Sequence, residues 1–404
     1  MLRGEIVERE SAILHAQVHY RTWVTYTFVG VISEEGGGSN PPVLALADGL
    51  RRLGHRVLLI GDDRITQVAT DRSIEVIVTS DQSGLREYFG PAYFRGWASR
   101  LADGDDLADV DPFTRWAETA FDETVEVVKS AAPALVFGGL LTSALAERLA
   151  PVLEVPWAFV NPAYVFGRAS PHSIEDDLAP GLPRHLFSTW LEPCCYRANV
   201  VLHATDPEFD PVPSLPLNHH QVGPLATTSS APHSAPNGAA NSVALVSIST
   251  DMQGEESIVH SAVAALEELE LTAVVTAPGR ADQLRRDHPD IRIEEFAPHD
   301  DLLPASRVFI THAGHGSVMN GLVYGVPMVL VPWSRDQPGV ARRAAELGAG
   351  IVVHRDALSG STMRSAIEEV LADEAITETA RRISGRLRNQ DPVSKACRIL
   401  TNTV

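Results

Sequence analysis

Residues with the chemistry of a ligand-binding site gather at the two ends of one stretch, ITHAGHGSVMNGLVYGVPMVLVPWSRDQPG (310–339). It begins with His312 in a turn of small residues and ends, after an apolar run, with the pair Asp336 and Gln337. Backbone N–H groups in a small-residue turn, together with a helix N-terminus, favour a phosphate group. A carboxylate beside an amide offers acceptors and donors to sugar hydroxyls. The stretch therefore indicates a site for a diphosphate joined to a sugar.

The elements around this stretch are expected to place both of its ends at one edge of a sheet. An apolar run at 307–310 predicts a strand, the small-residue turn follows it, and 316–325 has helical spacing. The next apolar run, at 327–333, predicts a second strand that ends just before Asp336. Ligands of open α/β sheets bind beyond the carboxyl ends of the strands, so the turn and the Asp-Gln pair should share one crevice.

An alternation of apolar runs and amphipathic segments extends over most of the chain and predicts α/β domains with parallel sheets. The first example is a strand at 23–32, a helix at 43–54 and a strand at 55–63. A polar segment without periodicity, typical of a linker, separates two such halves. The predicted units are an N-terminal domain (1–224, with an extension at 1–22), a linker (225–242), a C-terminal domain (243–385) and a helical tail (386–404) that packs back on the first domain.

The composition excludes several classes of partner. A formal charge of −19 on 404 residues argues against nucleic acid and against an anionic membrane surface. No apolar run reaches the roughly 18 residues of a membrane span, and the first twenty residues do not resemble a secretory signal. The three cysteines lack metal or redox spacing, which favours the cytoplasm. The preference for arginine over lysine, with abundant alanine, is typical of a high-GC bacterial genome, such as an actinobacterial one.

The segment THAGHGSVMNGLVYGVPMVLVPWSRDQPGVARRAAELGAGIVV resembles the donor-binding signature of the GT-B glycosyltransferases. More narrowly, it is similar to the family that glycosylates macrolides, enediynes and other natural products, to which the UDP-glycosyltransferases also belong. Matching pieces occur in order from about residue 23, among them GSNPPVLALADGLRRLGHRVLLIG, VALVSIST and IRIEEFAPHDDLLPASRVFITHAG. The resemblance implies a GT-B fold, in which two Rossmann-like domains with doubly wound parallel sheets face a central cleft.

The resemblance also implies a role for individual residues of the donor site. His312, Gly316 and Ser317, with Thr250 from another loop, would contact the diphosphate, to which the backbone at Gly314 is also suited. The Phe296 ring would stack on a pyrimidine, and the backbone near His299 would contact the edge of the base. Asn320 stands where the family has a glutamate for the ribose hydroxyls, and Asp336 with Gln337 would hold the sugar. The predicted donor residues are Thr250, Phe296, His299, His312, Gly314, Gly316, Ser317, Asn320, Asp336 and Gln337.

The general base usual in that family has no counterpart at the matching positions. The family uses a histidine in the first N-terminal loop, oriented by an aspartate at a later strand end, but Gly37 and the pair Gly138-Gly139 stand there. One explanation is another base, and the candidates are Glu34, Glu35 and Asp81, with His172 and Asp176 in the expected acceptor region. A second is an acceptor that is already nucleophilic. A third is a protein that binds without catalysing.

These observations predict an inverting, metal-independent glycosyltransferase that needs no cofactor besides its UDP- or dTDP-sugar donor. A histidine, a helix dipole and backbone donors can offset the charge of the leaving diphosphate without a metal. A small hydrophobic natural product is the expected acceptor. Gly37, Phe94, Trp97, Tyr164 and Phe166 are predicted to line its site. Two alternatives are a catalytically silent, nucleotide-binding partner of an active transferase and a sugar-nucleotide epimerase of the same fold; a homodimer is a further open alternative.

Overall fold

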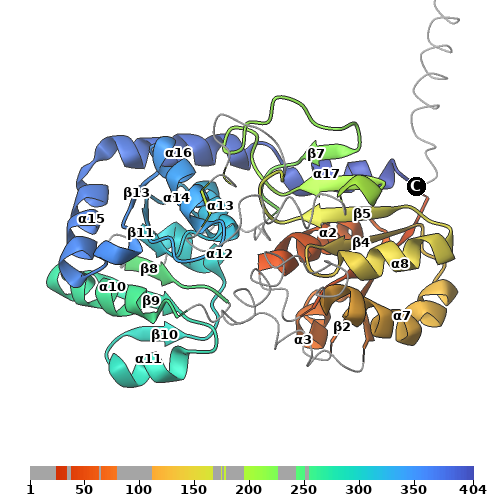
Figure 1. Cartoon of the computed structure of the whole chain (residues 1–404), viewed down its shortest axis with the longest axis horizontal. Helices are drawn as coiled ribbons and strands as arrows, with labels where there is room; N and C mark the ends of the chain where they lie inside the picture. The colour runs from red at the N-terminus through yellow and green to blue at the C-terminus, as the bar shows by residue number, and fades with distance from the viewer. Residues whose placement is uncertain are drawn as a thin grey trace, which may run out of the picture.

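Two α/β domains lie next to each other in the computed structural model, each built on its own sheet (Figure 1). The structure describes residues 24–33, 38–62, 65–79, 112–166, 174, 177–178, 195–225, 243–250 and 254–404. All strand pairings among these residues are parallel. The prediction of two doubly wound parallel sheets is therefore confirmed.

The N-terminal sheet has seven strands in the order β3-β2-β1-β4-β5-β6-β7. Its strands are β1 (Thr27–Val31), β2 (Arg56–Gly61), β3 (Glu75–Val78), β4 (Leu135–Gly139), β5 (Trp157–Asn161), β6 (Val200–His203) and β7 (His219–Gln221). The helices between them are α2 (Asn40–Arg52), α3 (Ile65–Thr70), α7 (Pro112–Ser130) and α8 (Ser143–Leu153). The central strands β1, β4 and β5 are mainly apolar and buried because both faces of a parallel sheet are covered by helices.

The C-terminal sheet has six strands in the order β10-β9-β8-β11-β12-β13. Its strands are β8 (Val243–Ser247), β9 (Thr272–Thr276), β10 (Arg292–Glu294), β11 (Ser306–Thr311), β12 (Met328–Leu330) and β13 (Gly350–Val352). The helices are α10 (Glu256–Glu268), α11 (Ala281–Asp287), α12 (His299–Leu302), α13 (His315–Tyr324), α14 (Gln337–Glu346), α15 (Gly360–Ala372), α16 (Glu374–Arg388) and α17 (Pro392–Thr401), with short 3-10 turns at Leu303–Ala305 and Arg355–Ala357.

Several boundaries differ from those expected from the sequence. Helix α2 begins at Asn40 rather than at 43, because Pro41 and Pro42 fit the first turn of a helix, where no N–H partner is needed. Leu225, assigned above to the linker, is buried in the N-terminal core. Helix α16 continues to Arg388, so the chain crosses back between the domains after that residue rather than at 386.

Among the described residues, no helix is long and apolar enough to span a membrane.

The last helix, α17, packs against α2 of the N-terminal domain, where Figure 1 also places the C-terminus. Its residues Ala396, Cys397 and Leu400 share one buried cluster with residues of α2. The helices approach closely at Gly49, because a Cβ atom there would lie 2.6 Å from Val393 Cγ1 and 2.7 Å from Cys397 Sγ. This contact ties the end of the chain to the first domain.

The substitution Gly49→Ala is expected to lower the free energy of unfolding by about 1–2 kcal/mol, because overpacking between α2 and α17 outweighs the better helix propensity of alanine. Urea unfolding followed by circular dichroism measures the change. Gly385→Ala in α16 is the matched control, since its Cβ would meet open space among the described residues. It should stabilise by up to about 1 kcal/mol. Equal stabilisation by both substitutions would contradict the packing of α17 on α2.

Candidate active site

A cleft of about 490 Å³ lies between the domains and is lined by residues of both. Its walls follow the carboxyl ends of strands, with Ser39 and Leu140 beyond β1 and β4, and Ser247 and His312 at β8 and β11. In both sheets these strand pairs are where the strand order reverses. Ligands of doubly wound sheets bind at such positions.

The structure brings the predicted donor residues together at this cleft. Its lining includes Thr250, Phe296, His299, His312, Gly314, Gly316, Ser317, Asn320, Asp336 and Gln337. Tyr164 and Phe166, predicted for the acceptor, line the opposite part. The remaining candidates lie outside the described residues, namely Glu34, Glu35, Gly37, Asp81, Phe94, Trp97, His172 and Asp176. The contacts of all these residues with a substrate stay predictions.

His312 follows β11 and is held in one orientation. Its Nδ1 lies 3.4 Å from the carbonyl oxygen of Ser247 at the end of the neighbouring strand β8. The opposite nitrogen, Nε2, lies against Gly314, where a Cβ atom would approach it to 2.6 Å. Gly314 is therefore needed for the observed ring position. Nε2 is thus directed toward the N-terminus of α13, where a diphosphate is predicted to bind.

The N-terminus of α13 has the properties of an anion-binding site. Its N-cap residue is Gly314, which has no side chain to cap the N–H groups of the first turn. Ala313, just before it, adopts the left-handed backbone conformation (φ 63°), a strained arrangement for a residue with a side chain. A methyl group at Gly316 would meet open space among the described residues. The free N–H groups and the helix dipole favour a negative charge here.

The predicted base-binding residues lie on the loop between β10 and α12 and at the start of α12. The Phe296 side chain is 76% exposed and lines the cleft, so its ring is accessible to a ligand. His299 lies edge-on to Phe309 with its Nε2 3.4 Å from the Thr276 hydroxyl. Burial lowers the pKa of His299 to about 4, so its side chain is neutral at pH 7. A stacked pyrimidine beside an uncharged imidazole is compatible with this geometry.

An ion pair that the sequence did not reveal fixes the loop that carries Thr250. Glu255 and Arg280 lie 3.2 Å apart and are buried. The Glu255 carboxylate accepts a hydrogen bond from the Ser249 N–H at 2.9 Å, and Arg280 donates to the Ser249 carbonyl. Burial raises the pKa of Glu255, and the charge of Arg280 opposes that rise. Since buried pairs are costly to break, this pair holds the backbone on which Thr250 faces the cleft.

The Asp336-Gln337 pair lies at the start of α14, beside the cleft. The Gln337 side-chain oxygen accepts hydrogen bonds from the N–H groups of Trp333 (2.9 Å) and Ser334 (2.8 Å), which closes the turn before α14. This oxygen is therefore occupied within the protein, and the amide can offer only its N–H donors to a sugar. Arg335, in the left-handed conformation (φ 57°), also lines the cleft, although no motif of the sequence pointed to it.

The part of the cleft predicted for the acceptor is a wall fixed by buried polar groups. Tyr164 and Phe166 pack edge-to-face at 5.2 Å and are almost fully buried, so their rings belong to the core as well as to the wall. Asn161 bonds the backbone of this segment, accepting from the Ala163 N–H at 3.0 Å. The carboxylate of Asp210 accepts from the Val165 N–H at 2.7 Å. Burial raises the pKa of Asp210 to about 6, against the opposing effects of that hydrogen bond and of Arg343.

The positions expected for the base-orienting aspartate are closely packed. A Cβ atom at Gly138 would lie 3.0 Å from the Thr142 carbonyl oxygen, and one at Gly139 would lie 3.2 Å from the Ser39 carbonyl oxygen. The Ser39 hydroxyl accepts a hydrogen bond from the Leu140 N–H at 3.1 Å. A side chain at either glycine would therefore require the backbone to move. Within the described ranges, no cluster of three or more His, Cys, Asp or Glu side chains is arranged to hold a metal.

His315, the first residue of α13, also lines the cleft, but its ring is bonded to the N-terminal domain. Its ring is 6% exposed and contacts the N-terminal domain, with Nδ1 3.0 Å from the Pro162 carbonyl oxygen and Nε2 3.1 Å from the Thr205 hydroxyl. Burial lowers its pKa to about 4, although the bond to Pro162 opposes the shift.

Comparison with known proteins is consistent with this geometry. Residues 260–395 match the family model of the erythromycin biosynthesis protein CIII-like C-terminal domain. An uncharacterized UDP-glucosyltransferase, YdhE of Bacillus subtilis, is 31% identical over 144 residues, which are 35% of this chain and 36% of that protein. The 4'-demethylrebeccamycin synthase of Lentzea aerocolonigenes is 30% identical over 131 residues, 32% of this chain and 31% of that one. The chain thus spans about a third of the length of these two relatives.

Solved structures match over nearly the whole chain. The glycosyltransferase of kitacinnamycin superposes with a TM-score of 0.71 and 21% identity, covering 94% of this chain and 99% of that one. The spinosyn rhamnosyltransferase SpnG complexed with thymidine diphosphate superposes with a TM-score of 0.65 and 17% identity, covering 93% and 100%. The chain therefore has the GT-B fold. The resemblance to the GT-B natural-product glycosyltransferases, indicated by the sequence, is confirmed by the family model and by these neighbours.

The buried titrating groups predict opposite changes in the pH dependence of stability. The pKa of His315 falls from 6.5 to about 4 on folding, so its contribution is present above pH 6.5 and is lost as the pH falls toward 4. The pKa of Asp210 rises from 3.8 to about 6, so ionisation of its carboxyl weakens the fold as the pH rises through that window.

Between pH 4.5 and 5.5, His315→Asn should therefore reduce the slope of unfolding free energy against pH by about 1.4 kcal/mol per unit, and Asp210→Asn should increase it by a similar amount. Urea unfolding at several pH values measures both slopes. Because the comparison uses slopes, a constant loss of stability in either variant does not affect it. Parallel curves for wild type and both variants would contradict the burial of these groups.

Proposed function

We propose that the protein is an inverting, metal-independent glycosyltransferase that moves a sugar from a UDP- or dTDP-sugar to a small apolar acceptor. The observation that carries the proposal is the convergence of an uncapped helix N-terminus, His312 and the Asp336-Gln337 turn on one cleft between two domains. The cleft then has one wall suited to a diphosphate and a sugar and another wall that is apolar. The proposal places the reaction in the cytoplasm.

The proposed reaction is a single displacement at the anomeric carbon. An acceptor heteroatom attacks the carbon from the face opposite the diphosphate, its bond to the sugar forms, and the carbon–oxygen bond to the diphosphate breaks. The diphosphate leaves with the electron pair, and the acceptor proton passes to a base or to solvent. Negative charge that develops on the leaving oxygen would be stabilised by the α13 N-terminus and by His312, which act without a metal ion.

Related proteins support the substrate classes. The names of several relatives contain UDP-glucosyltransferase, and solved neighbours include SpnG with thymidine diphosphate and SpnG with the spinosyn aglycone. Both nucleotides therefore remain in the proposal. The apolar wall of Tyr164 and Phe166 suits an apolar acceptor.

The base remains the open part of the mechanism. Glycines stand at positions 138 and 139, where the family has the orienting aspartate, and the backbone packs closely around them. Two explanations then remain for catalysis, namely a carboxylate such as Glu34, Glu35 or Asp81, or an acceptor nucleophilic enough to need none. The same observation favours a second candidate function, a catalytically silent nucleotide-binding partner. Nucleotide binding without nucleotide release from UDP- or dTDP-glucose, over a panel of phenol, alcohol and amine acceptors, would select that second function.

The substitution His312→Ala is expected to weaken nucleotide binding by about 1.5–3 kcal/mol, or about 10- to 150-fold, the range for a hydrogen bond to a charged group. Titration calorimetry with UDP and with dTDP measures the affinity and also shows which base is preferred. His260→Ala is the control, since His260 pairs with His288 at 2.8 Å and is absent from the cleft lining. Unchanged affinity in His312→Ala would refute the diphosphate assignment, and no binding of either nucleotide to the wild type would refute the proposed donor.

A further inference from the structure

Resting on the proposed function, we infer that His315 is a positioning residue that transmits occupancy of the donor site to the acceptor wall. Its backbone belongs to the first turn of α13, directly before Gly316 and Ser317, where the diphosphate is proposed to bind. Its side chain extends the other way and bonds Pro162 and Thr205 of the N-terminal domain. One residue therefore touches both halves of the site.

The two hydrogen bonds of His315 define its protonation. A carbonyl oxygen can only accept, so Nδ1 carries the proton and donates it to Pro162 at 3.0 Å. The unprotonated Nε2 then accepts from the Thr205 hydroxyl at 3.1 Å. The Phe209 ring lies edge-on to the imidazole at 5.8 Å between centroids. Directed bonds on opposite sides of a buried ring leave it little freedom to rotate, so a shift of the helix end must move its partners.

The partners of His315 lead directly to the acceptor wall. Pro162 lines the cleft and precedes the segment with Tyr164 and Phe166. Thr205 begins a short segment after β6, and Asp210 at the end of that segment bonds the Val165 N–H at 2.7 Å. A displacement at His315 would therefore reach the wall along two routes, through Pro162 and through Thr205.

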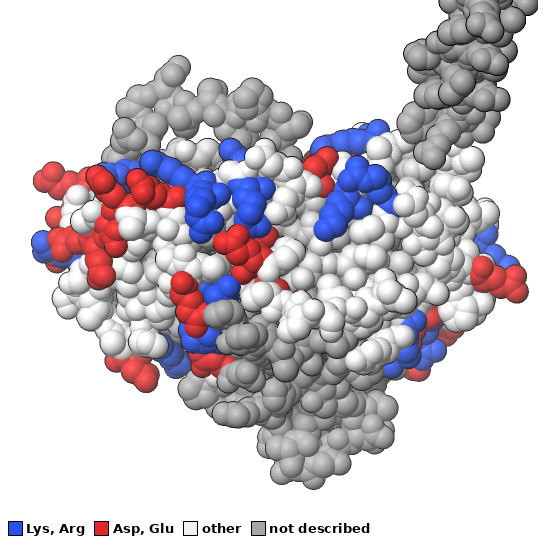
Figure 2. Space-filling view, turned by 90° about the horizontal axis from the view of Figure 1, so that it is seen from above, with Lys and Arg blue, Asp and Glu red and all other residues white. Residues whose placement is uncertain are grey.

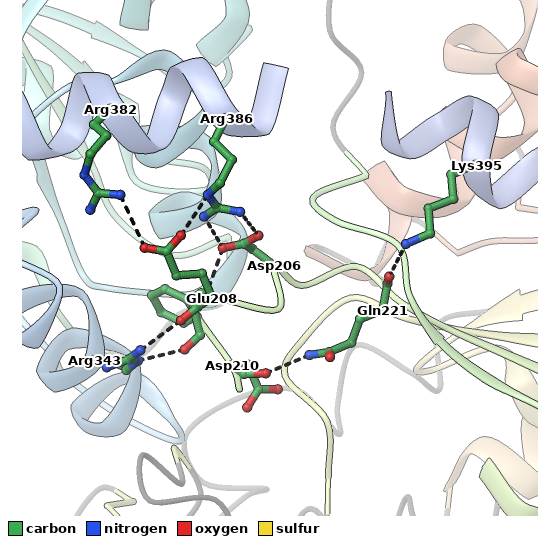
Figure 3. A network of polar contacts seen from close by, with 9 residues as sticks. Asp206, Glu208, Asp210, Gln221, Arg343, Arg382, Arg386 and Lys395 are labelled. Atoms are coloured by element: carbon green, nitrogen blue, oxygen red, sulfur yellow. Dashed lines mark hydrogen bonds and ion pairs between the residues drawn. The ribbon is translucent and has the colours of Figure 1, made fainter. Parts of the chain in front are cut away.

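The segment from Thr205 to Asp210 is held by arginines of the C-terminal domain (Figure 3). Arg386 of α16 binds both carboxylate oxygens of Asp206 at 2.6 Å. Arg343 of α14 donates to the carbonyl oxygens of Glu208 and Phe209, each at 2.8 Å. Although it follows a strand of the N-terminal sheet, the segment is anchored to helices of the other domain. The segment is thus held firmly between the domains. The hydrogen bond from Thr205 to His315 joins it to the proposed phosphate site.

The test is amide hydrogen exchange with and without saturating UDP and dTDP. In the wild type, nucleotide should slow exchange in the first turn of α13 and also in peptides covering 162–166 and 205–210. The expected slowing in those peptides is about 2- to 10-fold, the factor that one hydrogen bond of ordinary strength carries.

The variants separate the two bonds of the imidazole. Thr205→Val removes only the hydroxyl, with little change of shape, and His315→Asn retains a donor near the Nδ1 position while losing the acceptor at Nε2. Both should bind UDP within about threefold of wild type, less than the effect of one lost bond to a charged group. Both should lose the slowing in 205–210 while retaining it in α13. The double variant should show no further loss, because the two substitutions remove one bond.

Ser384→Ala is the matched control. Its hydroxyl donates to the Val323 carbonyl at 2.6 Å, so it supports the other end of α13 from within the same domain. This variant should lose stability but keep the slowing in 162–166 and 205–210. Normal nucleotide binding with undiminished slowing in Thr205→Val and His315→Asn would overturn the role of His315 alone. Failure of both nucleotides to bind the wild type would overturn the proposed function first, and this role with it.

Discussion

The uncapped N-terminus of α13 is the feature on which the rest of the site depends. A helix begins with N–H groups that have no partner inside the helix, and they require a cap, water or a ligand. Here the N-cap is Gly314, preceded by Ala313 in a left-handed conformation, and the His312 ring lies directly against the glycine. A side chain at 314 would displace the imidazole. The positive end of the α13 helix dipole therefore faces the cleft, with Gly314 and His312 beside it.

This local field matters because the chain as a whole is strongly acidic. A formal charge of −19 repels a nucleotide diphosphate at long range. Basic side chains do gather on the face formed by α16 and α17, as Figure 2 shows. Part of that charge is already neutralised, since Arg386 and Arg382 pair with Asp206 and Glu208. The backbone dipole of α13 and the His312 imidazole thus contribute to the proposed anion recognition, whereas Arg382 and Arg386 pair with carboxylates of the N-terminal domain.

The fold was predictable because buried parallel strands form apolar runs that are visible in the sequence. Examples are the strands VALVS and SRVFIT. The site was predictable as far as its residues follow strand ends in order. Contacts between distant residues were not predictable. His315 forms hydrogen bonds to partners 153 and 110 positions away in the sequence. Glu255 and Arg280 are separated in the sequence by helix α10 and strand β9. The hydrogen bonds of the Gln337 side-chain oxygen to Trp333 and Ser334 were not predictable either, although these residues are close in sequence. They depend on the backbone geometry of the turn.

The two glycines at the end of β4 bear on the chemistry more than any single charged residue. A Cβ atom at Gly138 or Gly139 would come within 3.0–3.2 Å of the carbonyl oxygens of Thr142 and Ser39, closer than an unstrained contact allows. The loop before α2 is joined to β4 by a hydroxyl–amide bond from Ser39 to Leu140 instead of through a carboxylate. Without a carboxylate at that strand end, a histidine in the loop would have nothing there to orient it or to stabilise its charged form. A transferase built this way must pass the acceptor proton to another group or select acceptors that release it readily.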